Sequence, residues 1–138
     1  MARLLFAFAV ILLFDSFAQA ADSYCWIAGG ATLYDGQTIN EKLKVVVSSV
    51  DRPHIPGRPG PRPWCMEQRR SLGGHSSSKI VEGPKLGQVH TNGYRVSYRG
   101  DRVGQDRFVI EHRWLNGSSN EWSTGRIIYE VEVLAQPM

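Results

Sequence analysis

Apolar and polar residues alternate through most of the second half of the chain, and a period of two residues is typical of a β-strand with one buried face. The stretch 87–108 predicts two strands around a turn, then a glycine-bearing loop and the start of a third strand. The alternation continues through 107–114 and returns in 126–134. The side chains that we expect to face inward are Tyr94, Val96, Tyr98, Phe108, Ile110, His112, Trp114, Ile127, Tyr129, Val131 and Val133.

The first half of the chain also predicts strands, with more interruptions between them. A strand over 24–33 is broken by Gly29-Gly30, and Asp35-Gly36 is a strong turn signal. A second strand is expected over 42–50, where Leu43, Val45 and Val47 would face inward. The remaining segments are expected as a strand resuming at 64–66, a polar loop at 71–78 and a short strand at 79–82.

The beginning of the chain has the pattern of a secretory signal peptide. Arg3 precedes the apolar run 4–14, and Ala18-Gln19-Ala20 is a small-x-small cleavage site. The apolar run is shorter than the roughly 20 residues that span a bilayer. We therefore expect a signal peptide at 1–20 and a periplasmic or secreted mature chain at 21–138, with no membrane span after cleavage. An uncleaved anchor or a buried helix is the alternative.

The mature chain is short, and no segment of it has a helical period. Its predicted strands are separated by glycine- and proline-containing turns, which favours an all-β sandwich. About 118 residues suffice for one domain with one modest core. The sequence thus predicts a single all-β domain over 21–138.

Cys25 and Cys65 are the only cysteines in the sequence. An even number of cysteines after an export signal favours an intramolecular disulfide, because disulfides persist in oxidising compartments. The bridge would close a loop of about 40 residues and stabilise the fold by roughly 4 kcal/mol in the chain-entropy description. Two buried free thiols are the alternative, and a metal site lacks the CxxC spacing or nearby histidine pair that it would need.

The segment 51–63 contains five prolines and cannot form regular sheet or helix. It carries Arg52, Arg58 and Arg62 on a stiff, extended loop. One interpretation is a loop that contacts an anion or serves as a PxxP-type motif. The other is a strand connection that the prolines merely stiffen.

Positive charge outweighs negative charge, with a formal net charge of +3. Arg95, Arg99, Arg107 and Arg113 occupy the polar positions of two strands that we expect to pair, which would place them on one sheet face. Such a face would attract an anionic polymer or partner. Alternatively, it is a solvated face whose arginines are interleaved with glutamates, where exposed ion pairs contribute little. No aromatic and basic module typical of nucleic-acid binders is present, so nucleic acid is not an expected partner.

Several residues between 80 and 134 form a pattern that resembles a known family. They are Gly87-x-Val89, Tyr98, Val103-Gly104-x-Asp106-x-Phe108 and a closing strand of alternating valines and aromatics. The pattern is similar to the bacterial immunoglobulin-like (cadherin-like) repeats of exported proteins. It departs from them at Arg99-Gly100, where a proline is usual, and at Val103, where an aromatic is usual. The resemblance implies an immunoglobulin-like β-sandwich in an exported protein.

The motif residues have physical roles that do not depend on the family. Gly104 supplies backbone freedom to a tight loop, Asp106 accepts backbone hydrogen bonds there, and Phe108 enters the core. Arg99-Gly100-Asp101 spells an integrin-type tripeptide, which we interpret as turn chemistry. Asn116-Gly117-Ser118 is a glycosylation sequon, but Asn-Gly is also a preferred hairpin turn.

Catalytic and metal-binding patterns are weak in this sequence. The four histidines, His54, His75, His90 and His112, lack HxxxH or HExxH spacing. No G-x-S-x-G motif is present, and no free cysteine is expected. We therefore expect neither an enzyme nor a metal or other cofactor.

The function predicted from these features is an exported, non-enzymatic binding module. Its contacts would be Arg52, Arg58, Arg62, Arg95 and Arg99, and its partner a polymer or protein of the cell envelope. The main alternative is a structural or accessory subunit that pairs with a partner through an edge strand. A small enzyme or metal-binding protein that uses the histidines is a third hypothesis.

Overall fold

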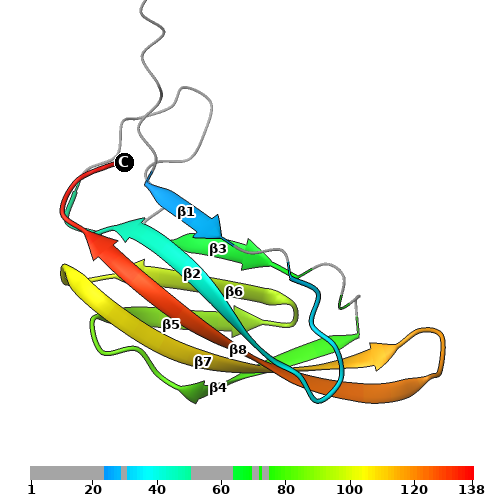
Figure 1. Ribbon diagram of the computed structural model, residues 1–138. Helices are drawn as coiled ribbons and strands as arrows, with labels where there is room; N and C mark the ends of the chain where they lie inside the picture. Colours follow the sequence, from blue (N-terminus) through cyan, green and yellow to red (C-terminus); the bar gives the residue numbers. More distant parts are fainter. Residues whose placement is uncertain (1–23, 29–30, 51–63, 70–71, 73–74) are drawn as a thin grey trace, which may run out of the picture.

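The computed structural model describes residues 24–28, 31–50, 64–69, 72 and 75–138. The regular elements of these residues are all β-strands (Figure 1). In chain order they are β1 (Cys25–Ala28), β2 (Thr38–Val46), β3 (Cys65–Gln68), β4 (Ser76–Glu82), β5 (Gly87–Asn92), β6 (Arg95–Gly100), β7 (Gly104–Asn116) and β8 (Glu121–Leu134). The all-β class predicted from the alternating pattern is therefore confirmed.

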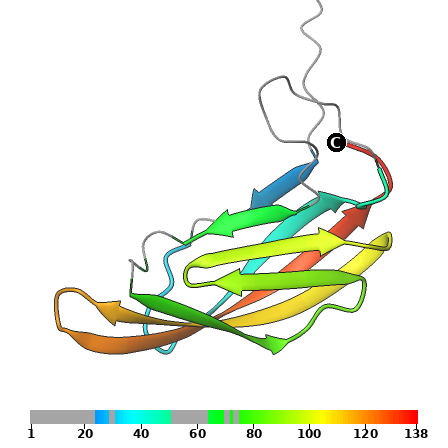
Figure 2. The same ribbon diagram turned by 180° about the vertical axis from the view of Figure 1, so that it is seen from behind.

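The strands form two sheets that stack face to face. One sheet has five strands in the order β1-β2-β8-β7-β4, and the other has three in the order β3-β6-β5. Figures 1 and 2 show the five-stranded sheet in front in one view and the three-stranded sheet in front in the other. Strands β2 and β8 run parallel, whereas the other paired strands are antiparallel. The architecture is a β-sandwich, as the sequence predicts.

Three aromatic rings form the centre of the core between the two sheets. Phe108 stacks on Tyr98 with ring centroids 5.4 Å apart and on Tyr129 with centroids 4.6 Å apart. All three side chains are 0–1% exposed, and offset stacking of buried rings adds to the free energy gained from the burial of their large area. Because Tyr98 comes from the three-stranded sheet and the other two from the five-stranded sheet, the stack joins the layers. The predicted inward alternation of β6, β7 and β8 is confirmed.

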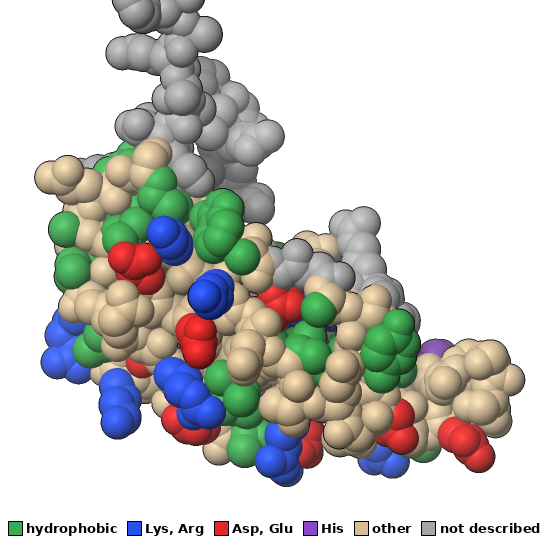
Figure 3. Space-filling view, in the orientation of Figure 1, with side chains coloured by type: hydrophobic (Ala, Val, Ile, Leu, Met, Phe, Trp, Pro, Cys, Tyr) green, Lys and Arg blue, Asp and Glu red, His purple; other side chains and the backbone are tan. Residues whose placement is uncertain are grey.

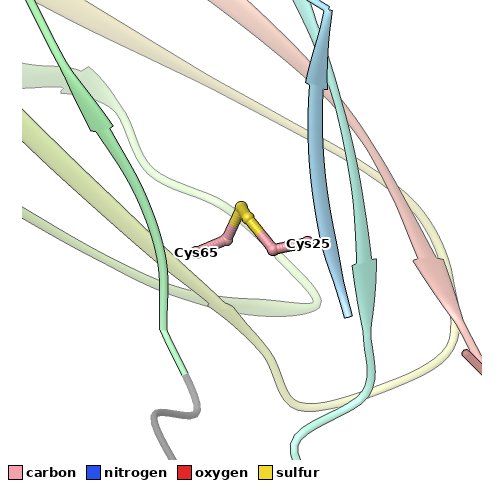
Figure 4. The surroundings of a disulfide bond; sticks show 2 residues. All are labelled: Cys25 and Cys65. Atoms are coloured by element: carbon pink, nitrogen blue, oxygen red, sulfur yellow. A yellow bond between two sulfur atoms is a disulfide. The ribbon is translucent and has the colours of Figure 1, made fainter. Parts of the chain in front are cut away.

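The disulfide between Cys25 and Cys65 is also confirmed (Figure 4). It connects β1, an edge strand of one sheet, to β3, an edge strand of the other, with the two Cα atoms 5.5 Å apart. The cross-link therefore ties the two layers together on one side of the sandwich. It also fixes β3, a strand of only four residues, to the body of the fold.

Several strand boundaries differ from the sequence prediction; β8, for example, begins at Glu121 rather than Arg126. β1 ends at Ala28 rather than Leu33. β2 begins at Thr38 rather than Lys42, because its parallel pairing with β8 already starts at Thr38. The prediction of a polar loop over 71–78 is wrong at its end, where β4 begins at Ser76. Serine has little strand preference of its own, and β4 gains its backbone partners from the well-defined strand β7.

Candidate functional site

The three-stranded sheet directs one set of side chains away from the core. Its buried residues, such as Val96 and Tyr98 on β6, alternate with outward-facing neighbours. The outward set, called the three-stranded outer face below, is Met66, Gln68, Gln88, His90, Asn92, Arg95, Ser97 and Arg99. It combines two arginines and a histidine with amides and contains no carboxylate.

Trp64 lies at the start of β3 and packs against this face. Its ring centroid is 4.7 Å from that of His90, and the guanidinium carbon of Arg99 is 5.3 Å from the Trp64 centroid. A guanidinium over an indole ring is a favourable cation–π contact. The three groups therefore form a small platform with one cationic and two aromatic members.

The two arginines of the three-stranded outer face differ in how far they are neutralised. Arg99 Nε lies 3.0 Å from Oδ1 of Asp101. The same carboxylate accepts hydrogen bonds from Ser48 on Oδ1 and from Gln88 on Oδ2. Arg95 is exposed and lies over the ring of Tyr94, 5.7 Å from its centroid. Within the described part of the chain, no carboxylate forms an ion pair with Arg95. The face therefore keeps the positive charge of Arg95. In the Arg-Gly-Asp tripeptide, by contrast, Arg99 and Asp101 form an ion pair with each other.

The five-stranded sheet presents a different outer surface, in which cations and glutamates are interleaved (Figure 3). The five-stranded outer face consists of Lys42, Lys44, Lys79, Glu82, Arg107, Glu111, Arg113, Arg126, Glu130 and Glu132. Glu111 pairs with both Arg126 and Lys79, at 2.9 Å and 3.5 Å. Lys44 pairs with Glu132 at 3.5 Å, and Arg107 pairs with Glu82. Most cations of this face therefore lie beside a carboxylate, which weakens their attraction for an anion.

The prediction that Arg95, Arg99, Arg107 and Arg113 share one face is wrong. The first two lie on β6, which pairs with β3 and β5, and the last two lie on β7, which pairs with β4 and β8. The chain crosses from one sheet to the other at 101–103 instead of turning back as a hairpin. The backbone N–H groups of Asp101 and Arg102 both donate to the Leu86 carbonyl there, at 2.8 Å and 3.0 Å. The arginines therefore point to opposite sides of the sandwich.

The proline-rich loop at 51–63 lies outside the described residues. Arg52, Arg58 and Arg62, and with them His54, have no structural account here. The described chain resumes at Trp64, which is part of the platform on the three-stranded outer face.

Asp106 accepts hydrogen bonds at the junction between the sheets. Its Oδ2 accepts from Tyr98 Oη at 2.7 Å and from the Leu86 N–H at 2.9 Å. Its Oδ1 accepts from the N–H groups of Lys85 and Arg107, at 2.8 Å and 2.9 Å. Burial raises the pKa of Asp106, but the hydrogen bonds lower it by more than burial raises it. The net pKa therefore lies below the usual value. The carboxylate fixes the chain before β5 to the start of β7, which is a structural role.

Two glycines of the same motif occupy places that a larger residue could not fill. A Cβ on Gly87 would lie 2.2 Å from the carbonyl oxygen of Arg99 and close to the ring of Tyr98. Gly104 has a φ of 141°, which favours glycine. Val89 and Phe108 lie in the core. These residues build the scaffold beneath the outer face and do not themselves present groups to a ligand.

A second group of charges lies between the sheets, and the sequence analysis missed it. Arg69 is 6% exposed and pairs with both Glu41 of β2 and Glu67 of β3, the second at 3.0 Å. Its Nη1 donates to the Ala31 carbonyl at 2.6 Å, and Tyr129 of β8 donates its hydroxyl to Glu67. The sequence did contain a signal, because Glu41 occupies an inward position between Ile39 and Leu43.

This group, called the Arg69 cluster below, contains two carboxyl groups, those of Glu41 and Glu67, and one cation, Arg69. Burial raises the pKa of Glu67, although Tyr129 and Arg69 oppose the shift. Burial and the neighbouring Glu67 also raise the pKa of Tyr129 well above its usual value. Tyr129 therefore stays a hydrogen-bond donor and is not a nucleophile at neutral pH. The cluster links β2, β3 and β8 and does not provide an activated group for catalysis.

His112 lies beside this cluster, on the inward face of β7 where the sequence predicts it. The side chain is 0% exposed, and within the described part of the chain neither ring nitrogen has a hydrogen-bond partner. Burial, with a smaller contribution from the charge of Arg69, lowers the pKa of His112 to about 4. The imidazole is therefore neutral near pH 7.

Comparisons with known proteins give no relative: no family model matches the chain, and neither a curated protein nor a solved structure matches it. The described residues contain no group of three or more His, Cys, Asp or Glu side chains that could hold a metal ion. They also contain no helix long and apolar enough to cross a membrane. The outer faces and the two buried polar groups are thus the features from which a function can be argued.

Proposed function

We propose that this protein is an exported, non-enzymatic binding module that contacts an anionic polymer through the three-stranded outer face. The observation that carries the proposal is the composition of that face. Its arginines stand among amides and aromatic rings, and among the described residues the carboxylate that pairs with them, Asp101, lies at its margin. Cationic groups without interleaved carboxylates attract anionic ligands and favour their approach.

The chemistry of the face suits a polymer with repeated carboxylate, sulfate or phosphate groups. Arg95 offers a guanidinium that no carboxylate of the described residues pairs with, and Asn92 offers an amide on the neighbouring strand. The platform of Trp64, His90 and Arg99 adds flat surface against which a sugar ring or a similar unit can pack. Because these groups lie on one sheet, a polymer strand could contact several of them at once.

Binding is favoured over catalysis by the state of the buried acids. Asp106 is saturated with four hydrogen bonds, and the Arg69 cluster joins its carboxylates to a guanidinium and a protonated tyrosine. Neither group resembles a general acid or base positioned toward a ligand. This supports the non-enzymatic hypothesis.

Export and the immunoglobulin-like family are part of the same proposal. The disulfide between Cys25 and Cys65 supports an oxidising compartment, in agreement with the signal pattern at 1–20. Two features support the family resemblance: the sandwich of two sheets, and the contacts that Tyr98 makes inside it with Asp106 and Phe108.

The test is salt-dependent retention on immobilised heparin, a standard anionic polysaccharide, by two variants of equal charge. Arg95→Ala/Arg99→Ala removes the cations of the three-stranded outer face, and Arg107→Ala/Arg113→Ala removes the same charge from the other face. We expect the first variant to elute at clearly lower salt than the unmodified protein, and the second to elute close to it. Equal losses in both variants, or no retention of the unmodified protein, would overturn the proposal.

A further inference from the structure

The described strands leave four edges in the sandwich, and three of these edge strands are protected against pairing with another chain. β1 and β3 have four residues each and are joined by the disulfide. β4 carries Lys79 and has a register irregularity between Ile80 and Glu82. Short length, an outward lysine and a bulge are the features by which natural edge strands avoid association.

β5 is the exception among these edges. It runs from Gly87 to Asn92 without a charged residue or a proline, and its register with β6 is unbroken from end to end. None of the described strands pairs with its other side. An uncharged, regular edge of six residues has the properties of a strand that accepts a partner strand.

The sequence of β5 is also complementary to itself in the antiparallel direction. With a two-fold axis at His90, Gln88 lies opposite Asn92 of a second copy, and Val89 lies opposite Thr91. The amides then face each other on the outer side, and the two β-branched residues on the inner side. No Asp, Glu, Lys or Arg side chain lies opposite another in this register.

We infer that β5 pairs with β5 of a second copy of this chain, so that the two three-stranded sheets become one continuous sheet. A two-fold antiparallel contact is the closed, self-complementary type of interface found in most homodimers. The inference is independent of any ligand. If the proposed function holds as well, the two outer faces would form one surface with twice the arginines, and a polymer would bind both copies with higher avidity.

Substitution of His90, at the centre of the pairing, tests the inference. His90→Glu places two carboxylates directly opposite each other, and like charges in this position destabilise paired strands. His90 is exposed, so we expect its replacement to leave the folded monomer intact. Sedimentation of the full chain without polymer, over a range of concentrations, should show a dimer for the unmodified protein. We expect a dissociation constant at least about tenfold higher for the variant.

Two further variants serve as a control for added charge and as a second substitution at the centre of the pairing. Ser77→Glu places the same charge at an exposed position on the other long edge strand, β4, and we expect it to leave the dimer unchanged. His90→Lys repeats the central test with the opposite charge and covers the case in which His90→Glu does not fold. The inference is overturned if the unmodified protein sediments as a monomer throughout, if the His90 variants dimerise as strongly, or if Ser77→Glu weakens the dimer equally. Because no polymer is present, none of these outcomes bears on the proposed ligand.

Discussion

Two groups of buried charged side chains lie between the sheets in the described part of the chain. Their carboxylates are stabilised in different ways, by backbone hydrogen bonds in one group and by an ion pair in the other. Asp106 is a single carboxylate that accepts hydrogen bonds from three backbone N–H groups and one tyrosine. The Arg69 cluster instead contains two glutamates around one guanidinium. In that cluster Glu41 Oε2 and Arg69 Nε have no hydrogen-bond partner among the described residues.

The difference shows what decides the protonation state of a buried carboxylate. Backbone donors hold the pKa of Asp106 below its usual value despite burial. At Glu67 the effect of burial exceeds that of its donors, so the pKa is raised. Asp106 is thus a fixed acceptor that organises the backbone. The Arg69 cluster depends on a single cation, so its stability should be more sensitive to substitution and to pH.

The largest effect is expected from removal of that cation. Arg69→Met keeps most of the side-chain volume but leaves Glu41 and Glu67 buried without a positive partner. The loss of one member of a buried ion pair costs about 3–5 kcal/mol. We expect a decrease of this size in the free energy of unfolding, measured by urea denaturation at pH 7.

The matched control replaces the acids in the same background. Arg69→Met combined with Glu41→Gln and Glu67→Gln removes the uncompensated negative charges and should recover most of the lost stability. If Arg69→Met costs less than about 1 kcal/mol, or if the triple variant is no more stable than the single one, the cluster does not depend on its cation as we infer.

His112 gives the next largest effect, and it depends on pH. Its pKa is lowered to about 4 from the usual 6.5, so below pH 6.5 the unfolded state binds a proton that the folded state excludes. Stability is therefore fully retained above pH 6.5 and falls by about 1.4 kcal/mol per pH unit down to about pH 4, or about 3 kcal/mol in all. His112→Leu should remove this dependence, with little change at pH 7.

Urea denaturation of both proteins between pH 8 and pH 4 checks this prediction. The difference in stability between the unmodified protein and His112→Leu should be constant above pH 7 and shift in favour of the variant as the pH falls. Parallel curves over the whole range would show that His112 titrates equally in both states.

Much of the fold could be predicted because alternation in the strands reports burial directly. Phe108, Ile110 and Tyr129 face inward as their spacing indicates, and the two cysteines pair. The sheet membership of β6 and β7 could not be predicted, because the same alternation fits a hairpin and a crossover between sheets. This is why Arg107 was expected beside Arg95. The Arg69 cluster was missed because a charged residue in a strand is normally expected on the solvent-exposed face. Glu41 is buried instead.

The smallest of these effects is expected at Asp106, because substitution there leaves part of the site in place. Asp106→Asn keeps one acceptor oxygen but turns an N–H₂ group toward donors of Lys85, Leu86 or Tyr98, and hydrogen bonds to a charged acceptor are lost. We expect a loss of about 2 kcal/mol in the free energy of unfolding at pH 7. Since the folded pKa is lowered, the stabilisation is present above the unfolded value of about 3.9 and disappears as the pH falls through the folded pKa. The difference between the two proteins should therefore persist from pH 8 to pH 5, where that of His112→Leu already changes. A difference that instead grew in favour of the unmodified protein as the pH fell from 7 to 5 would mean that the pKa of Asp106, like that of Glu67, is raised by burial, because the folded state would then take up the proton first.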